Sequence, residues 1–285
     1  MALVTSKEMI LDAQAHGYAV PAINTQGGNY DIIRAICFAA AEMRSPVMLA
    51  HYTSTGKYSG DEWFVEVCRY LAKQVPVPVA IHLDHGDSFE TCIKAVKLGF
   101  TSIMLDCSTE PLEDNIRHTN EIIKVCRTIE IPVEAEVGEL VRLDAAGAAA
   151  ENKNIAKVED VQKFLEGCQP DMLAIGIGNA HGFYKGEPQI RLDILEKVRA
   201  ITQIPLVLHG CTGMPDATVK EAIRLGVAKI NFGTLVRHKY VEFLKQAIDT
   251  MDHQGHSWKI SQFAEGKLEG TIREIIELSG SANQY

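Results

Sequence analysis

The sequence lacks several features that would assign it to a membrane-bound or nucleic-acid-binding class. Its apolar runs fall short of the length that a bilayer-spanning helix needs. Basic runs are missing as well, and the formal net charge of −9 disfavours binding to a polyanion. We therefore expect neither a membrane nor a nucleic acid as a partner.

Cysteine pairs and a secretion signal are also missing. Seven cysteines are scattered along the chain without a CxxC spacing, and Met1–Glu8 shows no signal-peptide pattern. An odd number of scattered cysteines is typical of thiols that stay reduced. The sequence therefore predicts a cytoplasmic protein in which the cysteines, Cys211 included, serve packing.

What the sequence does contain is a regular alternation of short apolar segments and longer segments with helical spacing of apolar residues. The polar segment Thr53–Gly56 is expected to be a loop. The expected strands cover residues 18–23, 46–50, 75–80, 102–105, 132–137, 172–177, 205–208 and 228–231. The expected helices cover residues 8–13, 31–43, 62–73, 112–128, 158–166, 192–201 and 216–225, with one more between Ser88 and Gly99.

This alternation predicts parallel strand–helix–strand units, and eight of them suit an α/β (β/α)₈ barrel. We expect one barrel domain over residues 1–285, with a helical extension from about residue 236. A doubly wound open sheet is the alternative. Polar residues at the strand ends favour the barrel, because only a closed ring brings them to one point. They are Asn24, Asp84, His85, Asp106, Glu136, His181, His209 and Asn231.

Three of these strand ends each present a histidine beside a glycine. His85 lies in the stretch Ile81–Gly86, while His181 and His209 follow two later strands. Histidine is the commonest metal ligand, and three protein ligands with an open position are typical of catalytic zinc. A lone histidine is more often an ordinary polar residue, but three at equivalent places predict a metal site.

The motifs around these residues resemble the class II, zinc-dependent ketose-bisphosphate aldolases, and the fructose- and tagatose-bisphosphate branch in particular. They occur in the same order as HLDHG, EAEVG, GNAHGFYKGEP, LVLHG and KIN with a following threonine, and the likeness runs from Tyr18 to Thr234. The resemblance implies reversible cleavage of a ketose 1-phosphate or 1,6-bisphosphate into dihydroxyacetone phosphate and an aldehyde. It also implies zinc without a Schiff base, and it allows a monovalent cation.

The resemblance assigns roles position by position. His85, His181 and His209 match the zinc ligands, Asp106 and Glu136 match acids that could form a second metal site, and Asp84 matches the carboxylate that moves the C4 hydroxyl proton. His82 is read as a supporting residue that does not bind the metal. Asn231 matches an enediolate contact. The residues expected to bind substrate are Asn24, Gly182, Lys185, Gly210, Thr212, Gly213, Asn231, Gly233 and Thr234.

The two glycine-containing turns have a physical reason to bind phosphate. Gly210–Gly213 and Asn231–Thr234 each precede an expected helix, whose backbone N–H groups favour an anion. They follow strands seven and eight, where barrel enzymes commonly bind phosphate. The usual middle pair of the first turn is replaced by Cys211 and Thr212, and the threonine retains a hydroxyl group.

The sequence departs from the family pattern in the segment 138–157, which is expected to be a functional lid, with a flexible linker as the alternative. The position of the family's proton-abstracting glutamate falls on Asp144, which becomes the candidate base. Arg142 could contact the far end of the substrate. Near the C-terminus Glu269 stands where a basic residue usually holds the second phosphate, so the sequence does not choose among the ketose phosphates.

Two other functions stay open at this stage. A metal-dependent sugar-phosphate isomerase or epimerase could use the same barrel and the same enediolate chemistry. A non-catalytic phosphosugar-binding subunit is disfavoured, because it would not need Asp84 and all three histidines. The extension from Val236 to Leu278, with a break near Gly255, exceeds what a barrel needs and predicts a homodimer or homotetramer.

Overall fold

Eight parallel strands close into a barrel in the computed structural model, which describes residues 3–139, 141–142, 155–184, 186–251 and 256–285. The order around the ring is β1-β10-β9-β7-β5-β4-β3-β2, so the (β/α)₈ prediction is confirmed and the open sheet is wrong. The barrel strands are β1 (Val20–Asn24), β2 (Val47–Tyr52), β3 (Val79–Gly86), β4 (Ser102–Leu105), β5 (Val133–Val137), β7 (Met172–Ile175), β9 (Leu206–Leu208) and β10 (Val227–Phe232).

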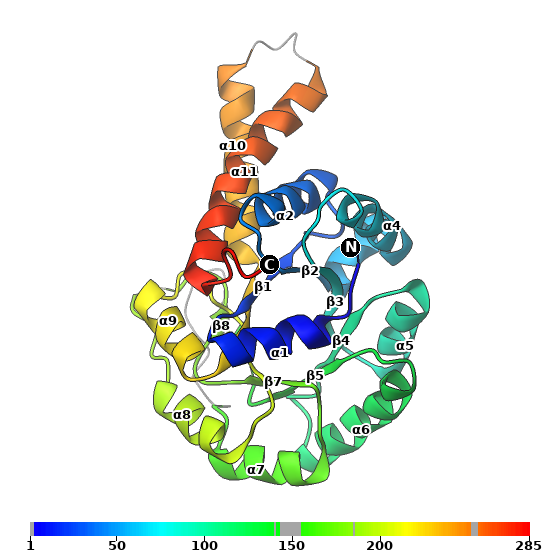
Figure 1. The fold of residues 1–285 in the computed structure, drawn as a ribbon, viewed down its shortest axis with the longest axis vertical. Coiled ribbons are helices and arrows are strands. Elements are labelled where there is room, and N and C mark those ends of the chain that lie inside the picture. The colour runs from blue at the N-terminus through cyan, green and yellow to red at the C-terminus, as the bar shows by residue number, and fades with distance from the viewer. Residues whose placement is uncertain (1–2, 140, 143–154, 185, 252–255) are drawn as a thin grey trace.

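Helices surround this ring, as Figure 1 shows. Two further strands, β6 (Val141–Arg142) and β8 (Ala180–His181), pair outside the barrel. The described helices are α1 (Ser6–His16), α2 (Tyr30–Glu42), α3 (Thr53–Ser59), α4 (Asp61–Ala72), α5 (Phe89–Leu98), α6 (Leu112–Thr128), α7 (Val158–Gly167), α8 (Leu192–Ile201), α9 (Asp216–Arg224), α10 (Thr234–Thr250) and α11 (Ser257–Ser279).

Local sequence signals explain several helix ends. The Ser88 hydroxyl accepts a hydrogen bond from the Thr91 N–H at the start of α5, as an N-cap should. The same helix ends at Gly99, whose φ of +103° is one that glycine adopts without strain. Asn29 caps α2 in the same way through the Ile32 N–H. These caps lie on the helices that pack against β2, β3 and β4.

Every second side chain of a barrel strand points into the barrel interior. Alanines from four strands belong to one apolar cluster inside the barrel. Helix α1 contributes Met9 and Ile10 to the same cluster and closes that end of the barrel (Figure 1). Along β3, Ala80, His82 and Asp84 all point inward, two residues apart. The interior therefore changes from apolar to polar toward the carboxyl ends of the strands, where barrel active sites lie.

Two expected elements differ clearly from the structure, besides smaller shifts at the ends of others. Residues 53–56 are helical, since they begin α3, where the Thr55 hydroxyl bonds the Tyr52 carbonyl and Gly56 lies so close to His51 that a Cβ would clash. The third strand is expected at residues 75–80 but covers Val79–Gly86. It begins late because Pro76 and Pro78 cannot donate to a strand ladder, and it continues past Ala80 because it pairs with β2 as far as Asp84.

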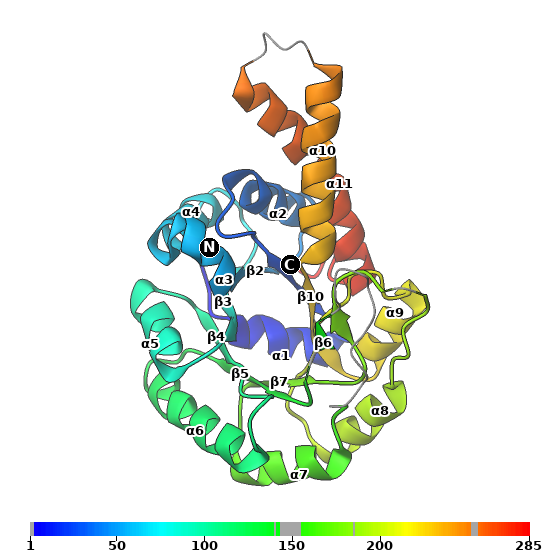
Figure 2. The ribbon, with the colours of Figure 1, turned by 180° about the vertical axis from the view of Figure 1, so that it is seen from behind.

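The α10–α11 pair extends away from the barrel in both views (Figures 1 and 2). It begins at Thr234, close to the expected residue 236, and α10 and α11 pack along each other. In the described parts of the chain, no helix combines the length and apolar character that a membrane crossing requires.

Candidate active site

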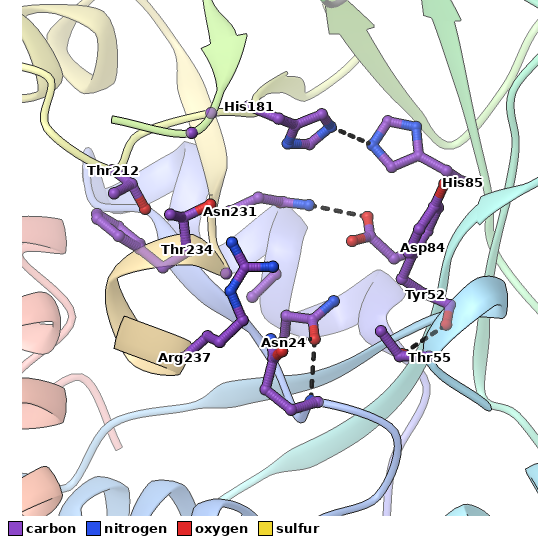
Figure 3. A pocket seen from close by; sticks show the side chains of 16 residues that line it. Asn24, Tyr52, Thr55, Asp84, His85, His181, Thr212, Asn231, Thr234 and Arg237 are labelled. Atoms are coloured by element: carbon purple, nitrogen blue, oxygen red, sulfur yellow. Dashed lines mark hydrogen bonds between the residues drawn. The ribbon is translucent and has the colours of Figure 1, made fainter. Parts of the chain in front are cut away.

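A cavity of about 350 Å³ opens at the carboxyl ends of the barrel strands (Figure 3). It collects residues from β1, β2, β3, β8 and β10, from α3 and α10, and from the turns that follow the strands. Most of the predicted site residues are among those that line it. The lining residues are Ala22, Asn24, Gln26, Tyr52, Thr55, Asp84, His85, His181, Gly182, Gly210, Thr212, Asn231, Phe232, Gly233, Thr234 and Arg237.

The three predicted metal ligands converge on one point. His85 Nε2 lies 3.2 Å from His181 Nε2 and 3.0 Å from His209 Nδ1. Two nitrogen ligands of a tetrahedral zinc ion, each about 2.0–2.1 Å from it, are themselves about 3.3 Å apart. The spacing of the three imidazoles therefore fits a zinc ion.

The hydrogen bonds of two of these rings also fit a metal. His209 Nε2 lies 2.8 Å from a carboxylate oxygen of Glu134, and His85 Nδ1 lies 2.6 Å from one of Asp106. Each ring donates to its carboxylate, so the opposite nitrogen is the one available to a metal. The Nδ1 lone pair of His209 then faces His85 Nε2, an arrangement that either a proton on His85 or a shared metal ion stabilises.

The negative charges around His85 also favour a cation at this position. Glu136 lies 4.0 Å from its Nδ1 atom, and Asp84 and Asp106 also surround it. Burial by itself lowers the pKa of His85, but the hydrogen bond to Asp106 and these carboxylates raise it to about 10. The site therefore favours a positive charge at His85. His85, Asp106 and Glu136 form a second group that could hold a metal, which fits the predicted second site.

Asp84 and His85 are neighbours in the chain, yet both line the cavity (Figure 3). A regular strand would point them to opposite faces. His85 has a φ of +51°, and the pairing of β3 with β4 contains one extra residue between Leu83 and Gly86. This bulge turns both side chains inward, and strained bulges of this kind are common next to active sites.

Asp84 is held by Asn231 from the opposite side of the barrel. The Asn231 amide donates to Asp84 Oδ1 across 3.0 Å, and its Nδ2 atom lies 3.4 Å from His209 Nδ1. Asn231 therefore connects the predicted proton-transfer group with the predicted metal site. Asn24 also lines the cavity, and its side-chain oxygen accepts hydrogen bonds from the backbone and the side chain of Gln26.

The two predicted phosphate turns lie side by side at the other end of the cavity. The Thr212 hydroxyl accepts a hydrogen bond from the Leu235 N–H, which connects the turn after β9 to the first turn of α10. Gly210 has a φ of +69°, and a Cβ there would clash with the Ala180 carbonyl. Gly213 belongs to the same turn but does not line the cavity.

Some of the predicted residues cannot be placed in the same way. Asp144 and Lys185 lie outside the described residues. The backbone of Arg142 pairs with that of His181 in the small β6–β8 sheet, which brings this part of the chain beside a predicted metal ligand. Their roles in proton abstraction and substrate binding stay predictions.

Several site residues were missed by the sequence reasoning. Tyr52, Thr55, Gln26 and Arg237 line the cavity, and Arg237 could have been expected from its place in the first turn of the helix after Asn231. Lys229 could also have been expected to point into the barrel as Asn231 does, because residues two apart on a strand such as β10 share a face.

Lys229 is a buried lysine in a barrel, but its geometry does not suit a Schiff base. Its ammonium lies 2.8 Å and 3.1 Å from the two oxygens of Glu134, and its exposed fraction is 0%. It does not line the cavity. The groups that face the cavity therefore include His85, His181 and Asp84 but not this amine.

The barrel and its site define the class of protein: an enzyme built on a (β/α)₈ barrel, with a histidine cluster and a carboxylate at the strand ends. Residues 4–284 match the family model described as fructose-bisphosphate aldolase class-II. The chain therefore belongs to the class II fructose-bisphosphate aldolase family and is an aldolase, and the predicted family is confirmed.

Individual relatives agree over their full length. The chain is 36% identical to a probable fructose-bisphosphate aldolase of Bacillus subtilis over 287 residues, with all of both chains covered. It is 32% identical to the D-tagatose-1,6-bisphosphate aldolase subunit GatY of Klebsiella oxytoca over 285 residues, again with all of both covered. Among solved structures, it resembles the YdjI aldolase of Escherichia coli K12 with a TM-score of 0.87, 29% identity and 99% of each chain covered.

Proposed function

We propose that this aldolase uses zinc, held by His85, His181 and His209, to cleave a fructose- or tagatose-type ketose 1-phosphate or 1,6-bisphosphate. The products would be dihydroxyacetone phosphate and an aldehyde. The observation that carries this proposal is the convergence of three imidazoles, two of them hydrogen-bonded to carboxylates, at a cavity that His85, His181 and Asp84 line. The substrates in the names of the relatives are bisphosphates of fructose and tagatose.

A zinc ion bound by the three histidines would supply Lewis-acid polarisation of a carbonyl oxygen. The chain's own groups do the rest. Asp84 takes the proton of the C4 hydroxyl as the C3–C4 bond breaks, and it returns that proton in the condensation direction. The hydrogen bond from Asn231 holds the carboxylate in place for this transfer, and a positioned carboxylate contributes about 10²–10⁴-fold to rate.

The phosphate of the dihydroxyacetone half would bind at the opposite end of the cavity. There the N-terminus of α10 begins at Thr234, directly after the Gly233 turn, and its N–H groups favour an anion. The Gly210 and Thr212 turn faces the same space. In this proposal Asp144 is the base that removes the hydroxymethyl proton. Lys185 and Arg142 contact the substrate.

A panel of ketose phosphates tests the reaction. The zinc-loaded enzyme should release dihydroxyacetone phosphate from fructose or tagatose 1,6-bisphosphate, or from a ketose 1-phosphate, as measured with a glycerol-phosphate dehydrogenase coupling assay. Ketose-to-aldose conversion without a triose product would instead indicate an isomerase. Binding of these sugars without turnover would indicate a non-catalytic subunit.

Arg237 provides a second test, since it is the only lysine or arginine among the described residues that line the cavity. Its side chain extends from α10 toward Asn231 and Thr234 (Figure 3). Arg237→Met should raise KM for the phosphorylated substrate about 10-fold or more, with a smaller effect on kcat, as expected when uniform binding is lost. The exposed Arg224 on α9 offers a control, and Arg224→Met should leave KM unchanged.

We further propose that the protein is a homodimer or homotetramer in the cytoplasm. Its active site would hold a monovalent cation in addition to zinc. The protruding α10–α11 pair carries exposed apolar side chains at Val241, Ile248 and Trp258, which suit contact with a second copy. All seven cysteines are free and buried, which suits a reducing compartment. A monomer by light scattering at micromolar concentration would contradict the oligomer.

A further inference from the structure

A buried ion pair lies directly below the histidine cluster, inside the barrel. Lys229 Nζ lies 2.8 Å from Glu134 Oε2 and 3.1 Å from Glu134 Oε1. Glu134 Oε1 is also 2.8 Å from His209 Nε2. Glu134 comes from β5, Lys229 from β10 and His209 from the end of β9, so the pair connects three different parts of the ring.

Neither member of the pair meets the substrate cavity. Glu134 and Lys229 are fully buried, and neither lines the cavity. Two charges taken out of water cost several kcal/mol each, and an apolar pair of similar volume is often as stable or more stable. A contribution to fold stability is therefore a weak explanation for this ion pair. An effect on His209, which Glu134 contacts, is a stronger one.

The geometry of the carboxylate shows what that role is. The Lys229 ammonium contacts both oxygens and so fixes the plane of the Glu134 carboxylate. With that plane fixed, Oε1 stays directed at the Nε2–H group of His209. The Asn179 amide holds the same histidine from its backbone, by donating to the His209 carbonyl across 3.0 Å.

We propose that Glu134 and Lys229 are positioning residues that set the tautomer and orientation of His209, so that its Nδ1 lone pair points at His85 Nε2 and the metal. Lys229 orients Glu134, and Glu134 orients His209. This inference rests on the proposed metal site and assigns it a supporting pair that the family resemblance did not supply.

Two double variants separate positioning from packing, because both remove the ion pair and only one retains a hydrogen-bond acceptor for His209. Glu134→Leu with Lys229→Met replaces the pair by apolar side chains of similar size. Glu134→Gln with Lys229→Met leaves an amide oxygen that can still accept from His209 Nε2. The affinity of the purified proteins for Zn²⁺ is measured by competition with a chromogenic chelator, and bound Co²⁺ reports the ligand geometry through its visible spectrum.

The Leu/Met variant should bind Zn²⁺ about 10–100-fold more weakly than wild type, as is usual when a metal-bound histidine loses its partner. Its Co²⁺ spectrum should change, while the metal-free protein should melt near the wild-type temperature. The Gln/Met variant should bind Zn²⁺ more tightly than the Leu/Met variant. Equal affinity in the two double variants, or wild-type affinity in the Leu/Met variant, would overturn the proposal.

A control and a measurement on the unmodified protein complete the test. Arg34 and Glu265 form another ion pair with a buried carboxylate, between α2 and α11, so Glu265→Gln should leave Zn²⁺ affinity unchanged.

In wild-type protein labelled with ¹⁵N-histidine, the resonances lost in His209→Ala should show a proton on Nε2 and none on Nδ1, and the reverse tautomer would contradict the proposal. A wild-type protein that binds no zinc would instead reject the proposed metal site itself.

Discussion

Removal of the metal is expected to abolish aldol cleavage, and Zn²⁺ or Co²⁺ is expected to restore it. Lewis-acid stabilisation of a developing oxyanion is worth several kcal/mol, so the loss should reach about 10³-fold or more. His181→Ala should have the same effect without any chelator, because it removes one of three converging ligands. The measurement is kcat/KM for release of dihydroxyacetone phosphate, together with the bound metal determined by mass spectrometry.

A histidine elsewhere on the surface supplies the control for this experiment. His16 is exposed at the end of α1, and His16→Ala should retain both metal and activity. Full activity in protein that has been stripped of metal would contradict the zinc proposal. So would a zinc-loaded structure in which one of the three rings points away while the activity persists.

The metal should also displace a proton. In the metal-free protein the pKa of His85 is raised to about 10, so this imidazole is protonated at neutral pH. A metal ligand must be unprotonated. Zinc binding should therefore release a proton, and affinity should rise as the pH is raised toward 10 and fall as the pH is lowered. Isothermal titration in buffers of different ionisation enthalpy measures that proton.

The parts of the fold that could be predicted are those in which local sequence and tertiary packing agree. The helices 112–128 and 192–201 and the strand 102–105 have the predicted boundaries. Helix 112–128 is amphipathic, and the strand 102–105 is buried throughout. Where the signals disagree, packing decides: Thr53–Ser59 contains β-branched residues and a glycine that favour a loop, yet it forms α3 through its contacts with β2.

The polar interior of β3 could not be predicted from apolar patterning. His82 and Asp84 are unusual inside a strand, so the apolar run that ends at Ala80 was the stronger signal. They are accommodated because the barrel supplies partners from other strands: His82 Nδ1 lies 2.8 Å from the Ser102 hydroxyl, and Asp84 accepts from Asn231. Such partners are close only after the ring has closed.

The candidate site also has a part that the sequence predicts and a part that it does not. Its residues could be named from the resemblance, since His85, His181 and His209 carry clear motifs. The turn of Asp84 and His85 to the same side could not, because it depends on the extra residue in the β3–β4 pairing and on a positive φ at a histidine. The Glu134–Lys229 pair was not recognised either, because 95 residues separate its members in the chain.

Asp84→Ala is expected to retain zinc and lose cleavage, with kcat lowered about 10²–10⁴-fold. The metal should stay bound because Asp84 bonds Asn231 rather than one of the three imidazoles in the described structure. A matched control is Asp160→Ala, in the first turn of α7 and away from the cavity, which should leave kcat unchanged. Turnover of Asp84→Ala within tenfold of wild type would remove Asp84 from the proton-transfer role.

The same variant should still exchange the hydroxymethyl proton of dihydroxyacetone phosphate with solvent, because that step is assigned to Asp144. Asp144→Asn should show the opposite pattern, binding dihydroxyacetone phosphate but failing to exchange its proton, as followed by NMR in deuterated water. Cleavage and exchange use separate carboxylates in this scheme, so the two defects should separate. Arg142→Ala should raise KM for an anionic substrate tail and leave exchange intact, since it removes only binding. Normal exchange in Asp144→Asn would transfer the role of base to Glu136, which is buried 4.0 Å from His85 Nδ1, or to Glu139 in the turn that follows.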